Sequence, residues 1–284
     1  MPIDREKALA AKFEPGEGRY SKDDVILYHL GVGAGSRPTD PGELEYTYEK
    51  NLKVLPSFTS VARSGAQSNF FDVPGLEFNR ALMLHGEQEV ELHRPLPPET
   101  ALRGQTRIAD IFDKGKAALL VLETAVSDDK GEALYTNRMS LFLRGEGGFG
   151  GPKGPDAAPS HPERAPDGVI ESPTLPQQAL LYRLNGDKNP LHCDPDFAAK
   201  GGFDRPIIHG LCSYGIVCKA VVDGVLGGEP GRVARYQARF RGVAFPGETY
   251  LTSFWKEGDT IFLEAKSKER DAVIISNASV TVRS

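Results

Sequence analysis

A short polar segment, residues 185–192, holds the side chains of this chain that are best suited to acid–base chemistry. Asp187, Asn189 and His192 fall within six residues, and a glycine and an Asn-Pro pair interrupt the segment. Glycine allows unusual backbone angles, and the residue before a proline is kept out of the helical region, so the pattern predicts a tight turn. We expect such a turn to direct the three polar groups at one point.

These three residue types suit proton transfer to and from a bound water. Histidine exchanges a proton near neutral pH, and a neighbouring carboxylate can make the complementary transfer. Asn189 would orient the water without titrating. Each residue alone also has a structural interpretation, with Asp187 capping the turn, Asn189 preceding the proline and His192 packed in the interior. Their gathering on one broken turn favours the catalytic interpretation.

A second feature begins seventeen residues after His192, at the dipeptide His209-Gly210. Apolar residues recur with the helical period over residues 208–222, which predicts a buried helix. Gly210 would then offer a free N–H at the positive end of that helix, suited to an oxyanion that develops on a carbonyl. The glycine could equally serve close packing, and both interpretations stay open. We interpret His209 as a cap or supporting residue.

Composition and charge limit the possible partners. The chain has 284 residues, 39% hydrophobic and 26% charged, and its net charge of −5 gives no electrostatic reason to expect nucleic acid or an anionic membrane. No apolar run approaches the ~20 residues needed to cross a bilayer, and the first residues lack a signal-peptide pattern. Three cysteines without Cys-x-x-Cys spacing indicate a reducing compartment, and the six histidines show no zinc pattern. We therefore expect a cytoplasmic protein that binds no metal, no nucleic acid and no membrane.

The secondary-structure pattern occurs twice along the chain. Residues 24–30 and 78–84 are predicted to be helical, residues 44–61 to be strand and turn, and residues 90–143 to form an antiparallel meander with one buried face. After a Gly/Pro-rich stretch the same sequence of elements returns, with helices at 177–184, 194–200 and 208–222 and strands at 233–241, 248–256, 260–266 and 272–282.

Similar segments recur at matching places in the two meanders, such as residues 97–102 and 246–251. This indicates a duplicated α+β unit in which a sheet wraps a helix. We predict an N-terminal domain over residues 1–150, a linker over 151–175 and a C-terminal domain over 176–284. Only the second copy carries the Asp/Asn/His turn.

Two segments resemble a known signature. Residues 182–198 and 206–215 resemble the motif of (R)-specific 2-enoyl-CoA hydratases, the MaoC-like hydratase 2 group with the hot-dog fold. Residues 84–88, 113–115 and 142–151 extend the resemblance to the two-domain form, which also occurs as the hydratase part of peroxisomal multifunctional enzyme type 2. The resemblance covers nearly the whole chain.

The resemblance implies a double hot-dog enzyme that adds water to a trans-2-enoyl-CoA and gives the (3R)-3-hydroxyacyl-CoA. It implies no cofactor, because coenzyme A is part of the substrate. Asp187 and His192 would be the acid–base pair, and Asn189 would help to place the water. The Gly210 N–H would bind the thioester oxygen.

By the same resemblance, His85, Gly86, Lys114 and Phe240 line the acyl-CoA site. The first domain would shape the acyl pocket, and we expect a homodimer by analogy. Two other functions remain as alternatives, an acyl-CoA thioesterase and a non-catalytic acyl-CoA-binding subunit. A histidine beside the carboxylate argues against the thioesterase, and the intact set of three polar residues argues against the binding subunit.

Overall fold

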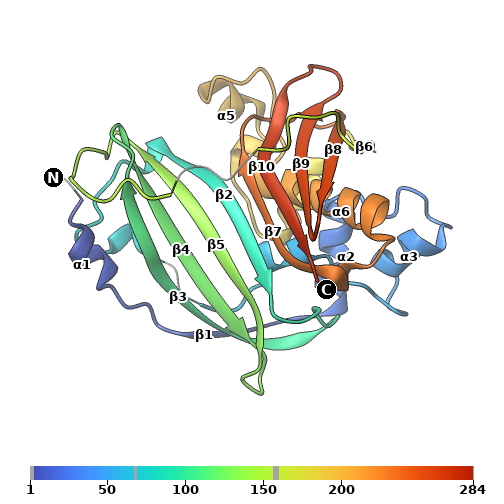
Figure 1. Cartoon of the computed structure of the whole chain (residues 1–284), viewed down its shortest axis with the longest axis horizontal. Coiled ribbons are helices and arrows are strands. Elements are labelled where there is room, and N and C mark those ends of the chain that lie inside the picture. Colours follow the sequence, from blue (N-terminus) through green and yellow to red (C-terminus); the bar gives the residue numbers. More distant parts are fainter. Residues whose placement is uncertain (1–2, 67–68, 156–159, 284) are drawn as a thin grey trace.

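The strands form a single antiparallel sheet in the order β1-β3-β4-β5-β2-β7-β10-β9-β8-β6 (Figure 1). The computed structural model describes residues 3–66, 69–155 and 160–283. The strands are β1 (Gly16–Tyr20), β2 (Met83–Leu92), β3 (Thr100–Asp113), β4 (Ala117–Ser127), β5 (Ala133–Arg144), β6 (Gly168–Pro173), β7 (Val233–Phe240), β8 (Thr249–Glu257), β9 (Thr260–Ser267) and β10 (Val273–Val282).

The strand order shows the duplication directly. Read from its outer edge, the first half runs β1-β3-β4-β5-β2, and the second half runs β6-β8-β9-β10-β7. The two halves therefore have the same topology and meet where β2 pairs with β7, in a register that sets Glu87 opposite Arg239 and Glu91 opposite Arg235. The predicted α+β class and double hot-dog architecture are confirmed.

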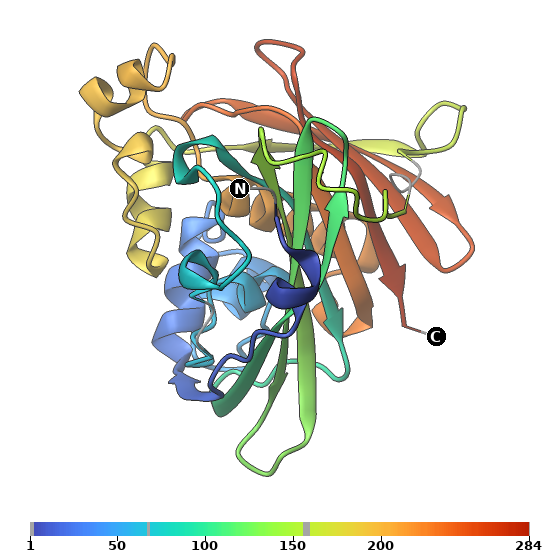
Figure 2. The same ribbon diagram turned by 90° about the vertical axis from the view of Figure 1, so that its left-hand side faces the viewer.

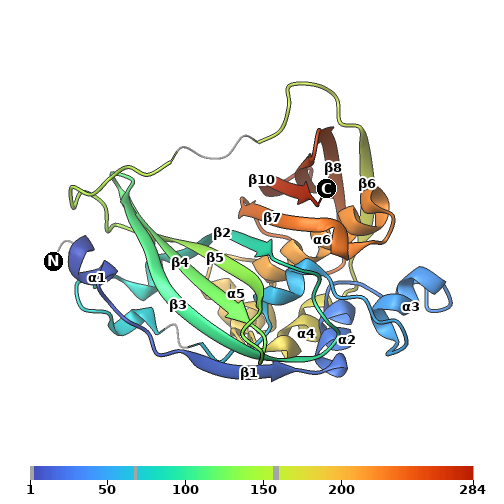
Figure 3. The same cartoon turned by 60° about the horizontal axis from the view of Figure 1, so that its bottom comes forward.

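The helices gather on one side of the curved sheet (Figures 2 and 3). The longest of those described, α6 (Gly210–Leu226), contacts strands of both halves and is buried along most of its length. The shorter ones are α1 (Arg5–Leu9), α2 (Lys22–Gly31), α3 (Pro41–Thr47), α4 (Gln178–Tyr182) and α5 (Pro195–Lys200), with 3₁₀ turns η1 (Pro56–Ser60), η2 (Phe70–Asp72), η3 (Arg80–Leu82), η4 (Arg183–Asn185), η5 (Pro190–His192) and η6 (Pro230–Arg232). Within the described ranges, none of the helices is long and apolar enough to span a bilayer.

Glycines on α6 let neighbouring elements approach its backbone closely. A Cβ at Gly215 would lie 2.5 Å from Val32 Cγ1 and 2.6 Å from the Tyr28 hydroxyl, just after and within α2. A Cβ at Gly224 would lie 2.6 Å from Ile170 Cδ1 on β6. Because backbone can approach only where no side chain intervenes, these glycines fix α6 against elements from both halves of the chain.

The two halves fill their concave faces differently. The segment before β7 contains the long helix α6, whereas the segment before β2 contains the shorter helices α2 and α3 and then the 3₁₀ turns η1, η2 and η3. Phe70, Val73 and Leu76 from this second segment are buried in one apolar cluster with strand residues such as Leu120 and Leu141. The first half is therefore covered by α1 together with turns and loops whose apolar side chains enter its core.

Three predicted segments differ in the structure. Residues 78–84 are not a helix: only η3 is helical, and β2 begins at Met83 because it pairs there with β5. Residues 44–61 contain α3 and η1 in place of the expected strand, since Asp40 caps α3 and a proline starts its first turn. The linker 151–175 is shorter than predicted, because β6 lies within it and pairs with β8.

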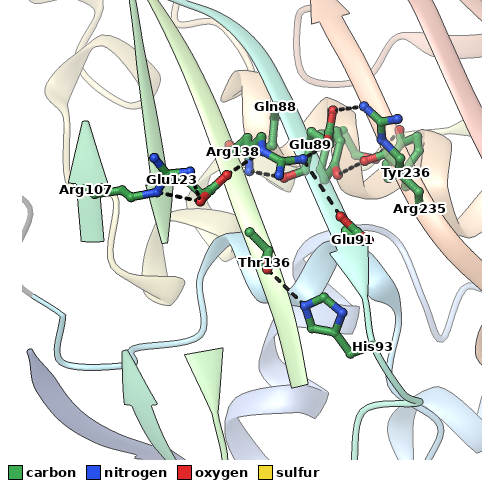
Figure 4. A network of polar contacts seen from close by, with 11 residues as sticks. Gln88, Glu89, Glu91, His93, Arg107, Glu123, Thr136, Arg138, Arg235 and Tyr236 are labelled. Carbon is green, nitrogen blue, oxygen red and sulfur yellow. Dashed lines mark hydrogen bonds and ion pairs between the residues drawn. The ribbon is translucent and has the colours of Figure 1, made fainter. Parts of the chain in front are cut away.

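A row of ion pairs crosses the face of the sheet opposite α6 (Figure 4). Arg138 on β5 contacts Glu89 on β2 at 2.8 Å and Glu123 on β4 at 2.7 Å. Arg107 on β3 extends the row beyond Glu123, and Arg235 on β7 extends it beyond Glu89, at 2.7 Å and 2.5 Å. The last contact joins the second half to the first, so the row reinforces the β2–β7 pairing with side chains.

A buried histidine ties α2 to the segment that follows α3. His29 is fully buried, its Nδ1 lies 2.8 Å from the Tyr46 carbonyl oxygen, and its Nε2 accepts the Leu55 N–H at 3.2 Å. A carbonyl only accepts, so Nδ1 carries the hydrogen and the ring is neutral. Burial lowers the pKa of His29 from about 6.5 to about 4.

This histidine makes stability depend on pH. Between about pH 6.5 and 4 the unfolded chain binds more protons at His29 than the folded one, so the contribution is present above pH 6.5 and is lost as the pH falls through this range. We expect His29 to account for a loss of about 3 kcal/mol in the free energy of unfolding. Denaturant titrations of the wild type and His29→Gln at pH 7 and pH 4.5 measure it. His29→Gln should be less stable than the wild type at pH 7, but its free energy of unfolding should fall less between pH 7 and pH 4.5. The control His93→Gln, at an exposed histidine, should show the same pH dependence as the wild type.

Candidate active site

The polar turn that opens the site is held by its own side chains. Gly186 has φ 127°, which a residue with a side chain rarely adopts. Oδ1 of Asp187 accepts the Asn189 N–H at 3.0 Å, and Oδ1 of Asn189 accepts the Leu191 N–H at 3.0 Å. One oxygen of each side chain thus builds the turn. The second Asp187 oxygen and the Asn189 amide nitrogen bond none of the described residues.

His192, at the end of η5, presents one nitrogen to the turn. Its side chain is buried, and its Nδ1 lies 2.9 Å from the Ile207 carbonyl oxygen. Because that oxygen can only accept, Nδ1 carries the hydrogen and Nε2 keeps a free lone pair. Burial is the largest influence on this ring and lowers its pKa, so His192 is neutral and basic at Nε2 around pH 7.

A second histidine lies directly against the first. The rings of His192 and His209 stack with centroids 3.7 Å apart, and the Tyr182 ring lies 4.9 Å from His209 on another side. Nε2 of His209 makes a long hydrogen bond, 3.4 Å, to the Asp187 main-chain oxygen. His209 thus contacts both Asp187 and His192.

The side chains of Asp187, His192 and His209 have the composition of a metal site. One ligand atom from each lies within 4.8 Å of the others. The lone pairs of imidazole lie in the ring plane, however, so two nearly face-to-face rings direct them side by side and not at a common point. The stacking therefore disfavours a bound ion and suits a pair of neutral rings.

Gly210, Phe240 and His85 form the facing wall. Gly210 begins α6 and its N–H has no helical partner, whereas the Cys212 N–H already donates to the His209 carbonyl oxygen at 3.0 Å. A Cβ on Gly210 would lie 3.4 Å from the Phe240 ring, which contacts the His85 ring edge-on at a centroid distance of 4.9 Å. His85 donates from Nε2 to the Glu87 carbonyl oxygen at 3.1 Å, which leaves Nδ1 as an acceptor. His85 belongs to β2 and Phe240 to β7, so both halves contribute to this wall.

The remaining two predicted residues lie near the opposite face of the sheet. Gly86 occupies a break in register between β2 and β5, and a Cβ there would lie 2.8 Å from the Phe142 ring. Phe142 and Lys114 line a cavity of about 240 Å³ that Glu87 and Arg239 also line. Lys114 donates to the Pro155 carbonyl oxygen at 3.1 Å. The eight predicted residues thus form two groups on either side of the β2 bulge.

Some neighbours of the site gave no usable signal in the sequence. The expected role of His209 as a cap or supporting residue agrees with its place at the N-cap of α6, but its ring makes no capping hydrogen bond among the described contacts, and its stacking on His192 had no signal in the sequence. Phe142 and Arg239 are separated from Lys114 by long stretches of chain and meet it only through strand pairing. Contacts between such distant residues depend on register, which the sequence alone did not provide.

The chain matches two family descriptions, one in each half. Residues 19–145 match "MFE-2 hydratase 2 N-terminal domain", and residues 157–278 match "MaoC like domain". The Mycobacterium tuberculosis protein "Enoyl-CoA hydratase ChsH3" is 47% identical over 99% of both chains. The chain belongs to the MaoC-like hydratase 2 family. It is an enoyl-CoA hydratase, a hydro-lyase that acts on acyl-CoA thioesters.

Solved structures agree with the architecture of this hydratase. A MaoC-like dehydratase from Phytophthora capsici, 34% identical, superimposes with a TM-score of 0.87 over 98% of each chain. A Mycobacterium tuberculosis protein described as having a double hotdog fold is only 12% identical and superimposes with a TM-score of 0.57 over 96% of each chain, which supports the fold alone. The homodimer and the cytoplasmic location stay predictions.

The bulge at Gly86 gives a prediction about this hydratase. In Gly86→Ala the new methyl group would overlap the Phe142 ring, so we expect a loss of about 1–3 kcal/mol in the free energy of unfolding and a displaced His85. Thermal unfolding and the KM for crotonyl-CoA measure the two effects. Gly231→Ala is the matched control, because its Cβ would meet Pro95 at an ordinary 3.5 Å. Equal behaviour of the two variants would contradict the tight fit.

Proposed function

We propose that this hydratase adds water reversibly to trans-2-enoyl-CoA to give the (3R)-3-hydroxyacyl-CoA, with Asp187 and His192 as the acid–base pair. The observation that carries the proposal is a buried, neutral His192 with a free Nε2 lone pair, one ring nitrogen of which lies within 4.8 Å of an Asp187 carboxylate oxygen. One water molecule fits between groups at this separation and can bond both. Asn189, on the same turn, adds an amide that orients the water.

The acid–base pair accepts one proton and returns one proton in each hydration step. Water attacks C3 of the enoyl thioester as its proton passes to the acid–base pair, with Nε2 of His192 as the acceptor. The pair returns one proton to C2 of the resulting enolate on the same face, so that H and OH are added together and both groups regain their starting state. A neutral imidazole is required at the start, and the lowered pKa of His192 favours it.

The charge that develops on the thioester oxygen needs a donor. The Gly210 N–H at the start of α6 is such a donor, since it is unpaired in the helix and lies at the positive end of the helix dipole. Phe240 and His85 pack beside it and make this wall largely apolar, which strengthens a hydrogen bond to an oxyanion.

The cavity on the other side of the β2 bulge fits the polar part of the substrate. Lys114 supplies positive charge there, Arg239 is paired with Glu87 at 2.6 Å, and Phe142 and Leu119 supply apolar surface. Phosphates of coenzyme A are recognised by such cations, and its uncharged arm tolerates apolar walls. In this proposal the thioester lies near His85, and Lys114 contacts the nucleotide end.

The first half is proposed to receive the acyl chain. Its concave face carries the apolar cluster of turn residues such as Phe70 and Leu76, with no counterpart of the acid–base turn among its described residues. This division of roles gives one active site for each chain. A cytoplasmic location and a homodimer are kept as predictions of the same proposal.

A single assay separates hydration from the two alternatives. The wild type is incubated with crotonyl-CoA and with a longer trans-2-enoyl-CoA, while the enoyl absorbance and free thiol are followed. Loss of absorbance without thiol supports hydration, release of thiol supports a thioesterase, and neither change supports a non-catalytic acyl-CoA-binding subunit. Chiral analysis of the product tests the (3R) configuration.

The acid–base pair is tested by substitutions that preserve shape. Asp187→Asn and His192→Gln should each lower kcat for crotonyl-CoA hydration by roughly 10²–10⁴-fold, because proton transfer is lost while packing is retained. Circular dichroism and thermal unfolding should stay close to those of the wild type. Full activity in either variant would remove the proposed mechanism.

The cavity lined by Lys114 and Phe142 predicts an effect on substrate binding but not on the chemical step. Lys114→Ala should raise the KM for crotonyl-CoA by about twofold to tenfold and leave kcat nearly unchanged, because an exposed cation contributes modestly to binding a phosphate. Crotonyl-N-acetylcysteamine, which lacks the nucleotide, should react equally with both proteins. The matched control is Lys116→Ala, an exposed lysine two residues further along the same turn. An unchanged KM in Lys114→Ala would contradict this placement of the nucleotide.

A further inference from the structure

His209 occupies a central place between the helix that faces the substrate and the turn that carries the acid–base pair. It is 1% exposed and immediately precedes Gly210. Its ring is stacked on His192, its Nε2 reaches the Asp187 main-chain oxygen, and Tyr182 packs on it from α4. Among the described residues, it thus contacts both members of the pair at once.

The hydrogen bonds of His209 define its protonation. The Asp187 oxygen is an acceptor, so the ring donates from Nε2, and the buried Nδ1 has no partner among the described residues. A second proton would place an unpaired N–H and a positive charge in a dry site beside another imidazole. Burial and then His192 lower the pKa of His209. The His209 ring is therefore neutral and does not readily exchange protons near pH 7.

We propose that His209 is a positioning residue for the hydration reaction, which holds His192 in place by ring stacking and holds the Asp187 turn by its Nε2–H. This inference rests on the proposed function, since it concerns the same acid–base pair. His209 would act on the two reacting groups without touching the substrate. Its place next to Gly210 also couples the turn to the start of α6, so the acid–base pair and the oxyanion donor keep a fixed separation.

The stacked His209 ring also shields the His192 ring from water. One face of the His192 ring is covered by His209 and therefore closed to water. The titratable and charged groups that act on the two rings are Asp187 in the turn, Tyr182 on α4 and Arg183 on η4, besides the histidines themselves. Without the His209 ring, water would reach the His192 ring. The charged imidazolium form would then be better solvated, and the pKa of His192 would rise toward its ordinary value.

Two variants separate stacking from hydrogen bonding. His209→Phe keeps a ring against His192 but loses the Nε2–H, and His209→Asn keeps a donor but loses the ring. In both we expect kcat for crotonyl-CoA to fall by at least about tenfold with KM nearly unchanged, because small misplacements of reacting groups are costly. The acid limb of the kcat/KM profile should move to higher pH in His209→Asn and stay at the wild-type position in His209→Phe. His93→Asn, on an exposed histidine bonded to Thr136, is the control and should match the wild type.

The outcomes distinguish the inference from the proposed function. If the wild type does not hydrate crotonyl-CoA, the proposed function fails first. If the wild type is active and both His209 variants keep its kcat, or if His209→Asn loses activity with an unmoved acid limb, the positioning role is overturned and the proposed function stands. Should His209→Asn fail to fold by circular dichroism, His209→Phe decides: reduced kcat at an unchanged KM supports the role, and wild-type kcat overturns it.

Discussion

The pairing of β2 with β7 is the constraint on which the site depends. It joins two halves of equal topology into one sheet and sets His85 of the first half beside Phe240 of the second. Phe240 in turn contacts the start of α6 at Gly210. A shift of one residue in this pairing would turn every side chain to the other face, so the register determines whether the facing wall exists at all. The ion pairs of Arg235 and Arg239 with Glu89 and Glu87 reinforce that register.

The second half could be predicted well from sequence because its signals are local. Glycine and Asn-Pro at the polar turn, the helical period of α6 and the alternation of β7 to β10 each depend on neighbouring residues. The prediction failed where distant contacts decide the structure. Residues 78–84 carry helix-forming side chains, yet β2 starts among them because β5 pairs with Met83 and Leu84. Likewise β6 lies in a Gly/Pro-rich stretch and exists only because β8 offers an edge.

The residues of the site also fall into those that local sequence predicts and those that only tertiary packing brings together. Asp187, Asn189 and His192 are close in the chain, so their grouping followed from one turn. The stacking of His209 on His192 and the sharing of a cavity by Lys114 and Arg239 arise from tertiary packing, and no spacing in the sequence indicates them. The structural and the catalytic interpretations of the turn also prove compatible. One oxygen of Asp187 caps the turn, and the other stays available for water.

Duplication followed by divergence explains why one chain needs two similar halves for one reaction. A single hot-dog unit offers one curved sheet and one covering helix, and α6 with its polar turn already fills that space in the second half. In the first half the corresponding cover consists of the short helix α1 and of short turns whose aromatic side chains enter the core. Such a cover can change its side chains without disturbing an acid–base pair. In the proposed function, chain-length preference and catalysis lie on separate segments, which the β2–β7 pairing and the packing of α6 against the first half hold together.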